Sequence, residues 1–283
     1  MKLVIKLYKK HLAVCLCLCV IFCTSVAAKQ STDRICYKLP IIMYHHISES
    51  KSASGNYVIK PETFENDIRY LSQNGYKTIT AKQLIEFEKK GTPLFDKSVM
   101  ITFDDGYESF YAYAFDILKK YNYTAILSVI GSQADKYSSI EDHNISYSNS
   151  NWNQLKQMQD SKVVEIGNHT YNLHSFGERK GCMIKPGEDE YEYSQMLRKD
   201  ILLNKSKMES RGIESYIFTY PFGKKCESAE KVIKQIGYEV SLGCEEKVNL
   251  LYGSNMDELQ NMHRFNRPEG KDSQQFFSKI LNN

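Results

Sequence analysis

The chain has 283 residues, of which 42% are hydrophobic and 25% are charged, a composition that supports a folded core and excludes a disordered chain. Its formal net charge of +3 is explained by four lysines in the first 28 residues, which contain no acidic side chain. The rest of the chain is close to neutral, which excludes a strongly basic nucleic-acid-binding surface, and no nucleic-acid partner is expected.

The first segment has the pattern of a secretory signal. Its lysines precede an apolar run from Leu12 to Val26, and small side chains continue as far as Ala28. We predict a signal peptide over residues 1–28, cleaved near Ala28, and therefore a secreted or cell-surface protein. An uncleaved membrane anchor is the alternative. Residues 29–39 are predicted to be a linker and residues 40–283 a single domain, whose oligomeric state and association with membrane or cell wall stay open.

Strands and helices are predicted to alternate along that domain. In its first half the predicted strands are 40–44, 76–79, 99–103 and 125–130, and the predicted helices are 61–74, 81–90 and 110–121. The segment 131–151 is rich in Ser and Asn and is predicted to be a surface loop.

The second half continues the alternation. The predicted helices are 152–160, 191–209, 227–236 and 273–281, the predicted strands are 163–166, 216–220, 238–242 and 262–265, and 175–188 is a loop. Several strands are apolar on both faces, which favours an α/β domain with a parallel sheet. A count of about seven strands suits a barrel-like closure as well as an open sheet.

Four cysteines lie beyond the predicted signal, and no C-x-x-C pair is present among them. In an exported protein they could form two disulfides or remain free thiols, and the sequence leaves both open. They are Cys36, Cys182, Cys226 and Cys244.

The stretch T-F-D-D-G, residues 102–106, ends a buried strand with two adjacent carboxylates. Buried carboxylates need a stabilising partner, and a metal cation is the simplest one. Neighbouring side chains on a regular strand point to opposite faces, but at a turning strand end both can reach one site. Asp105 could then bind a metal while Asp104 stays free as a base.

A second strand end carries two histidines, His169 and His174, in the stretch H-T-Y-N-L-H. Five residues apart, they would lie on different faces of a helix, so they can share a metal only in a turn or loop. The carboxyl ends of parallel strands meet at one edge of a sheet. Asp105, His169 and His174 would there form a site with two imidazoles, one carboxylate and open positions.

These motifs resemble those of the polysaccharide deacetylase family, the family-four carbohydrate esterases with a NodB-homology domain. F-T-Y-P-F-G at residues 218–223 resembles the third motif of that family. The resemblance implies a distorted (β/α)7-type barrel in which Asp105, His169 and His174 hold a divalent metal. Zinc is the expected ion, with Co²⁺, Ni²⁺ or Fe²⁺ as alternatives, and Asp104 is the expected general base.

The third motif is expected to contribute to the substrate groove. By resemblance, the backbone N–H of Phe222 is expected to help hold the oxyanion. The side chains of Tyr220 and Phe222 are the better candidates for stacking on sugar rings.

The sequence departs from the commonest family pattern in two ways. The histidines are five rather than four apart, and Thr219 stands where the third motif often has an arginine that orients the base. Arg264 or Arg267 is expected to replace that arginine. The histidine spacing and an early M-Y-H-H resemble the poly-β-1,6-N-acetylglucosamine deacetylases, whose general acid is an early histidine. This assigns the acid to His45.

His263 is the rival for the role of general acid. The leading hypothesis is therefore a metal-dependent N-deacetylase that acts on N-acetylglucosamine residues of an extracellular polysaccharide. Peptidoglycan is the alternative substrate, and a carbohydrate-binding protein with weak turnover is a further alternative. A non-haem iron oxygenase could use the same ligand types, but the adjacent Asp104 argues against it.

Overall fold

The structure is a computed structural model that describes residues 36–50, 55–140 and 142–281. The predicted signal peptide, residues 1–28, lies outside the described residues, as do residues 29–35. The predicted linker is wrong at its end, because β1 (Tyr37–Leu39) pairs antiparallel with β11 (Asn249–Leu251). Leu39 is fully buried there, so this short segment belongs to the folded domain.

The centre of the domain is an eight-stranded sheet in which every pairing is parallel. Seven strands follow the order β10-β9-β8-β7-β6-β2-β12, and β5 pairs with β6 off this path. All six residues of β6 are buried, as expected for a parallel strand that is covered on both faces. The strands are β2 (Ile41–Tyr44), β5 (Lys77–Thr78), β6 (Ser98–Phe103), β7 (Ala125–Val129), β8 (Val164–Asn168), β9 (Ile217–Thr219), β10 (Val240–Leu242) and β12 (Phe265–Asn266).

A short segment near the end of the chain brings the two edges of this sheet together. Met262 bridges to Leu242 in β10, and three residues later Phe265 pairs with Ile42 in β2. Since β10 and β12 stand at opposite ends of the strand order, the sheet curls toward a barrel. The predicted barrel-like closure of a parallel α/β sheet is confirmed.

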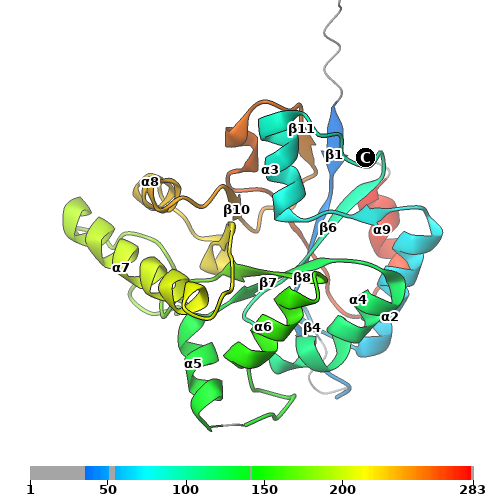
Figure 1. Ribbon diagram of the computed structural model, residues 1–283, viewed down its shortest axis with the longest axis horizontal. Helices are drawn as coiled ribbons and strands as arrows, with labels where there is room; N and C mark the ends of the chain where they lie inside the picture. Colours follow the sequence, from blue (N-terminus) through cyan, green and yellow to red (C-terminus); the bar gives the residue numbers. More distant parts are fainter. Residues whose placement is uncertain (1–35, 51–54, 141, 282–283) are drawn as a thin grey trace, which may run out of the picture. The chain divides into compact units, whose positions relative to one another are not determined.

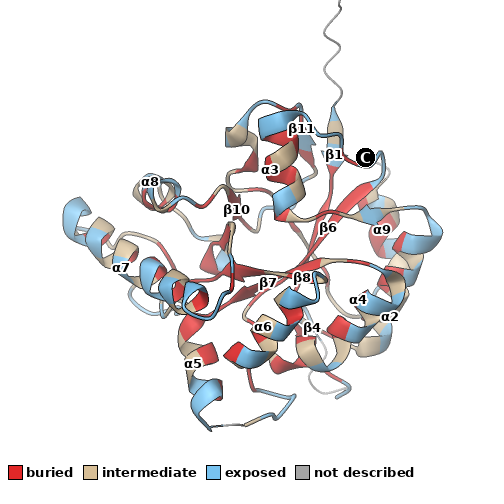
Figure 2. Ribbon diagram, viewed as in Figure 1, coloured by how far each residue is buried: buried red, intermediate tan, exposed pale blue. Residues whose placement is uncertain are grey.

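Helices lie around the strands, with buried faces turned toward the sheet and exposed faces outward (Figures 1 and 2). A π-helical turn, η2 (Phe110–Ala114), leads into α4, and a 3₁₀ turn, η3 (Pro221–Gly223), follows β9. The helices are α2 (Pro61–Gln73), α3 (Ala81–Lys90), α4 (Phe115–Tyr121), α5 (Gly131–Ile140), α6 (Trp152–Asp160), α7 (Glu190–Glu209), α8 (Glu227–Ile236) and α9 (Ser273–Leu281).

Helix α5 contradicts the prediction of a loop over residues 131–151. Its buried positions are Gly131, Ala134 and Tyr137, three residues apart. Two small residues and one tyrosine give too weak an apolar stripe to stand out in a Ser-rich sequence. Gly131 is required at its start, because a Cβ there would overlap the side chains of Asn204 and Tyr171.

The remaining elements are short. They are β3 (His46–Ile47), which pairs with β4 (Val58–Ile59), and the 3₁₀ turn η4 (Met256–Leu259). The four cysteines within the described ranges are free thiols. None of the helices described is both long enough and apolar enough to span a bilayer.

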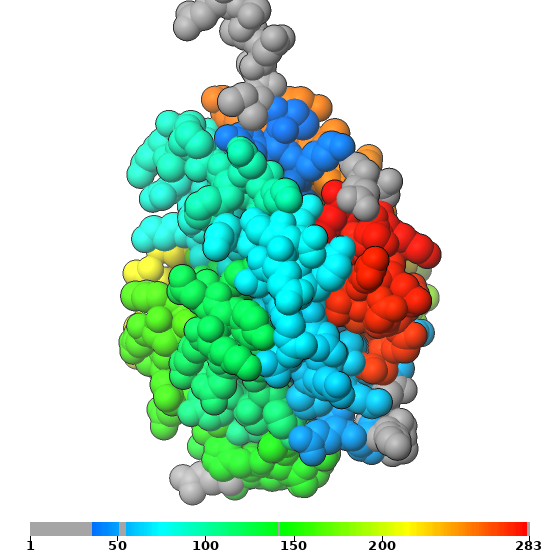
Figure 3. Space-filling model, turned by 90° about the vertical axis from the view of Figure 1, so that its right-hand side faces the viewer, coloured from blue at the N-terminus to red at the C-terminus, as the bar shows by residue number. Residues whose placement is uncertain are grey.

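A fully buried ion pair joins the C-terminal part of the chain to α2. Arg267 donates to both carboxylate oxygens of Asp67, at 2.8 and 3.0 Å, and Asp67 also accepts hydrogen bonds from Tyr44 in β2 and Ser273 in α9. Figure 3 shows the C-terminal segment, in red, against the cyan segment that contains α2. The pair therefore links β2, α2 and α9.

We predict that Arg267→Met destabilises the fold, because it leaves the Asp67 carboxylate buried without its cation. The free energy of unfolding, measured by urea denaturation, should fall by about 3–5 kcal/mol. Lys231→Met is the matched control, since it breaks an exposed pair with Glu227 and should leave stability nearly unchanged. Equally small losses in both variants would contradict this role for the buried pair.

Candidate active site

The end of β6 turns sharply and separates two neighbouring carboxylates. Asp105 has a φ of 70° and Gly106 a φ of 77°, both in the left-handed region. Gly106 suits this turn, because a Cβ there would lie 3.0 Å from Cγ1 of Val129. The left-handed conformation of Asp105 costs roughly 1–2 kcal/mol and is characteristic of functional sites.

Asp105 faces both predicted histidines. Its Oδ1 lies 3.5 Å from Nε2 of His169 and 3.2 Å from Nε2 of His174. One ligand-type atom from each of the three side chains lies within 4.8 Å of the other two. His169 directly follows β8, and Thr170 turns the chain with a φ of 70°, which lets His174 return to the same site. The structure thus brings the predicted triad together.

The hydrogen bonds around the triad fit a divalent metal. Nδ1 of His169 lies 2.8 Å from the carbonyl oxygen of Thr219, so Nδ1–H donates there and Nε2 is left with its lone pair toward Asp105. Oδ1 of Asp105 is buried and accepts no hydrogen bond from the described residues. Two imidazole nitrogens and one carboxylate with open positions are a ligand set suited to catalytic zinc.

Side chains of α7 form hydrogen bonds with the loop that carries the histidines. The two carboxylate oxygens of Asp200 accept the backbone N–H groups of Tyr171 and Asn172, at 2.8 and 2.9 Å. The side chain of Asn204 donates to the carbonyl oxygen of Thr170 at 3.0 Å. These bonds hold the turn between the two imidazoles.

Asp104 has an entirely different partner. Arg264, which is fully buried, donates from its two terminal nitrogens to the two oxygens of Asp104, each at 2.8 Å. Burial alone would raise the pKa of Asp104, but the guanidinium more than offsets this and holds the pKa well below its ordinary value. Arg264 is therefore the arginine that replaces the missing one at Thr219, whereas Arg267 pairs with Asp67.

His45, at the end of β2, lies beside the Asp104–Arg264 pair. Its Nε2 is 4.0 Å from Oδ2 of Asp104. Burial lowers the pKa of His45, and the carboxylates of Asp104 and Asp105 oppose that shift. His263 does not line this part of the site, and its nearest carboxylate is that of Glu245 at 3.6 Å.

A cleft of about 930 Å³ opens over these residues. Asp104, Asp105, His45 and both histidines of the triad line it, and so does a set of exposed or half-exposed aromatic side chains. Those aromatic residues are Tyr57, Tyr107, Tyr147, Phe176 and Phe222. Within the cleft, the centroid of the Phe222 ring lies 4.4 Å from the centroid of the His174 ring and 5.0 Å from that of the Phe176 ring.

The expectation that Tyr220 stacks on sugar is wrong in this structure. Tyr220 is only 1% exposed and packs with Phe218 and Ala229 in a core cluster outside the cleft. The physical reason is that the backbone of Tyr220, directly after β9, still donates a hydrogen bond to Leu242 in β10, and the chain enters the left-handed region only at Phe222, whose φ is 59°. Phe222, in contrast, lines the cleft as predicted.

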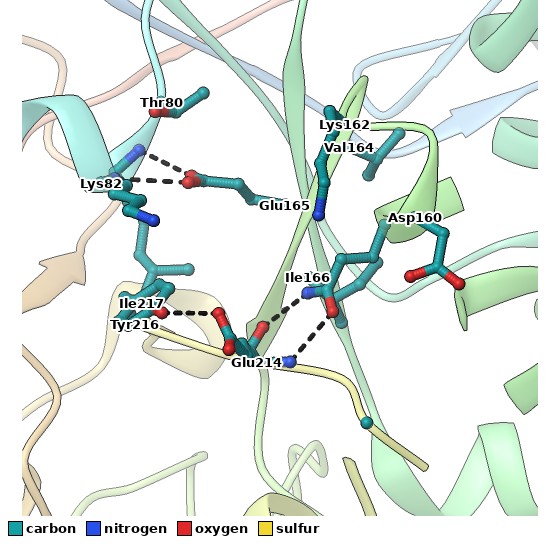
Figure 4. A pocket seen from close by; sticks show the side chains of 13 residues that line it. Thr80, Lys82, Asp160, Lys162, Val164, Glu165, Ile166, Glu214, Tyr216 and Ile217 are labelled. Carbon is teal, nitrogen blue, oxygen red and sulfur yellow. Dashed lines mark hydrogen bonds between the residues drawn. The ribbon is translucent and has the colours of Figure 1, made fainter. Parts of the chain in front are cut away.

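A separate hollow of about 350 Å³ lies at the other ends of the strands (Figure 4). Its main acidic groups are already bonded, since Glu165 accepts the backbone N–H groups of Ala81 and Lys82 at 2.6 and 3.3 Å. Glu214 likewise accepts a hydrogen bond from the hydroxyl of Tyr216 at 2.6 Å. No histidine or cysteine is among the described residues that line it, and Glu165 there holds the first backbone N–H groups of α3.

Comparison with known proteins agrees with this geometry. The sequence pattern of the polysaccharide deacetylase family matches residues 92–241, which include the strand end at Asp104 and the histidine loop. The chain belongs to the polysaccharide deacetylase family.

Two similar proteins from different bacteria carry the same name. The chain is 24% identical over 251 residues to the poly-beta-1,6-N-acetyl-D-glucosamine N-deacetylase of Escherichia coli (strain K12), covering 82% of this chain and 37% of the relative. It is 28% identical over 204 residues to the protein of the same name from Staphylococcus aureus (strain N315), covering 72% and 66%. This polysaccharide deacetylase family member thus spans only part of the length of these relatives.

Solved structures share the fold. A de-N-acetylase from Aggregatibacter actinomycetemcomitans superposes with a TM-score of 0.73 at 24% identity, covering 87% of this chain and 99% of that one. IcaB from Ammonifex degensii superposes with a TM-score of 0.71 at 23% identity, covering 87% and 97%. At these identities the likeness concerns the fold of this family member.

Two supporting groups were not predicted from the sequence. Asp200 lies in a helix crowded with charged residues, and no local signal distinguishes it from the others. The carbonyl oxygen of Thr219 acts through the backbone, so its residue type carries no information. Only the position of Thr219 in the third motif pointed to this strand end.

We predict that His174→Ala abolishes metal binding, because it removes one of three ligands. After dialysis against zinc, metal analysis should find about one equivalent in the wild type and almost none in the variant. The control is His143→Ala, which removes a half-exposed histidine that pairs with Glu108 instead. Full zinc loading of His174→Ala would contradict the triad.

Proposed function

We propose that this chain is a metal-dependent N-deacetylase of the polysaccharide deacetylase family that acts outside the cytoplasm. The observation that carries the proposal is the pairing of two adjacent carboxylates with different partners. Asp104 is held by Arg264, and Asp105 faces two imidazoles at the floor of the same cleft. Hydrolysis of an acetamide needs a base beside an electrophilic centre, and this arrangement supplies places for both.

Asp105, His169 and His174 would hold the metal. When bound there, a divalent cation polarises the acetamide carbonyl and lowers the pKa of a coordinated water molecule. Zinc is the ion we propose on the basis of the donor set.

Asp104 is the proposed general base. Its bidentate contact with Arg264 uses one lone pair on each oxygen and leaves further lone pairs to accept a proton from the attacking water. Arg264 is a positioning residue, because it keeps the carboxylate ionised and fixes its orientation. The oxygen of water adds to the carbonyl carbon while its proton passes to Asp104.

His45 is the proposed general acid. As the carbon–nitrogen bond breaks, the leaving nitrogen needs a proton, and Nε2 of His45 lies on the cleft wall beside Asp104. The products are acetate and a free amine on the sugar. The backbone N–H of Phe222 is proposed as a donor to the oxyanion that forms on the carbonyl oxygen.

The substrate we propose is a poly-β-1,6-N-acetylglucosamine type of polysaccharide. The names of the E. coli and S. aureus relatives support this choice, and so do the exposed aromatic rings of Tyr57, Phe176 and Phe222, which offer stacking surfaces for pyranose faces. Export through the predicted signal peptide would bring the enzyme to such a polymer.

We predict that Asp104→Asn keeps its zinc but loses activity, since the amide no longer accepts the proton. Acetate release from β-1,6-linked N-acetylglucosamine oligomers should fall by roughly 10²–10⁴-fold. Asp116→Asn, at an exposed position on α4, is the control and should match the wild type. Wild-type turnover by Asp104→Asn would overturn the assignment of the base. Faster wild-type release from peptidoglycan fragments than from the oligomers would overturn the proposed substrate.

The assignment of the acid is tested by a pair of histidine variants. His45→Ala should lower kcat for acetamide hydrolysis by roughly 10²-fold or more, because protonation of a leaving amine is difficult without an acid. It should slow hydrolysis of an activated aryl acetate much less, since that leaving group departs without help. His263→Ala should behave as the wild type, and the reverse pattern would move the acid role to His263.

A further inference from the structure

A second, smaller hollow adjoins the cleft on another side of the triad. Its volume is about 280 Å³, close to the lower end of ordinary ligand pockets, roughly 300 Å³. Asp105, His174, Tyr107 and Tyr147 line both hollows. The two spaces therefore meet at the metal-binding residues, and a ligand long enough could occupy both at once.

The two hollows differ in chemistry. The larger cleft contains the exposed aromatic rings of Tyr57, Phe176 and Phe222, none of which lines the smaller one. Hydroxyl and amide groups, together with Ile130, line the smaller hollow away from the triad. Such neutral donors and acceptors suit the hydroxyl groups of an uncharged sugar and offer nothing to an ionic ligand. The polar residues are Ser132, Gln133, Asn149 and Asn172.

Two of these four side chains, Gln133 and Asn172, have an amide nitrogen that is not used in a hydrogen bond to the described residues. Nδ2 of Asn149 already donates to the carbonyl oxygen of Asp105, at 2.7 Å, and the hydroxyl of Ser132 donates to Oδ1 of Asn172, at 3.3 Å. The side-chain amide of Gln133 and Nδ2 of Asn172 make no hydrogen bond to the residues that the structure describes. Gln133 and Asn172 thus have side-chain amide donors available to a ligand.

The smaller hollow is rigidly connected to the triad. Asn172 lies in the loop between His169 and His174, and its backbone is held by Asp200. The start of α5, which carries Gln133, is tied to the same loop by the backbone bonds from Gly131 to Thr170, at 3.1 Å, and from Ser132 to Tyr171, at 2.9 Å. A ligand held in this hollow would therefore be positioned relative to the reacting centre.

We propose that the smaller hollow is a second sugar subsite. It holds a residue of the polymer next to the one that loses its acetyl group, through hydrogen bonds to the amides of Gln133 and Asn172. This inference rests on the proposed deacetylase function, because it needs a polymeric substrate that passes the triad. It makes the enzyme selective for chains that are long enough to fill both hollows.

The test compares a chain with a substrate too small to bridge the hollows. For wild type and Gln133→Ala, kcat/KM is measured on a β-1,6-linked N-acetylglucosamine tetramer and on an aryl acetate, which reports on the triad alone. In Gln133→Ala, the kcat/KM for the tetramer divided by the kcat/KM for the aryl acetate should fall about tenfold. The change should come mainly from a higher KM for the tetramer, as expected for one lost hydrogen bond. Gln73→Ala, exposed at the end of α2, is the matched control and should leave the ratio unchanged.

The outcomes separate the subsite from the proposed function. An unchanged ratio in Gln133→Ala, with normal wild-type turnover of the tetramer, would overturn the subsite alone. Equal losses on both substrates would also overturn it, because Gln133 would then support the catalytic centre and not the chain. A wild type that cleaves the aryl acetate but releases no acetate from the tetramer would overturn the deacetylase function and the subsite with it.

Discussion

The site depends on how one buried strand ends in two neighbouring carboxylates. Asp104 and Asp105 are side by side in an interior where neither is stable as an anion without a partner. The chain separates them, since Arg264 holds Asp104 through two hydrogen bonds of 2.8 Å, and a φ of 70° turns Asp105 toward two imidazoles. One carboxylate is paired with a cation that the protein itself supplies. The other is left with an oxygen free to ligate one, which is why adjacent residues can take different chemical roles.

The parallel sheet explains how residues so distant in sequence meet. Three strands of the sheet, β6, β8 and β9, are each followed by a turn that contains a non-glycine residue in the left-handed region, namely Asp105, Thr170 and Phe222. Each turn aims a functional group at one point: a carboxylate, two imidazoles and an aromatic ring. Residues 262–266 bridge the two edge regions of the sheet, and Arg264 within this segment contacts Asp104. The conformational energy that these left-handed residues cost is offset by the packing of the surrounding core, in which the strands are almost entirely buried.

Much of this could be predicted from the sequence, because its signals are local. Apolar strands alternating with amphipathic helices predicted the parallel sheet, and the placement of Asp105, His169 and His174 at strand ends predicted their meeting. The sequence could not decide between Arg264 and Arg267. Their partners, Asp104 and Asp67, lie far away in the chain, with several strands of the sheet in between. The burial of Tyr220 depends on where the strand turns outward, which its residue type does not reveal. Helix α5 was missed because its buried side is formed by small residues.

The most direct test of this account is to locate a zinc ion in crystals by anomalous scattering at the zinc edge. The account predicts an ion roughly 2.0–2.2 Å from a carboxylate oxygen of Asp105 and from Nε2 of both His169 and His174. It also predicts that Asp104 stays paired with Arg264 and makes no contact with that ion. An ion bound elsewhere, or one coordinated by Asp104 in place of Asp105, would contradict the division of roles between the two carboxylates.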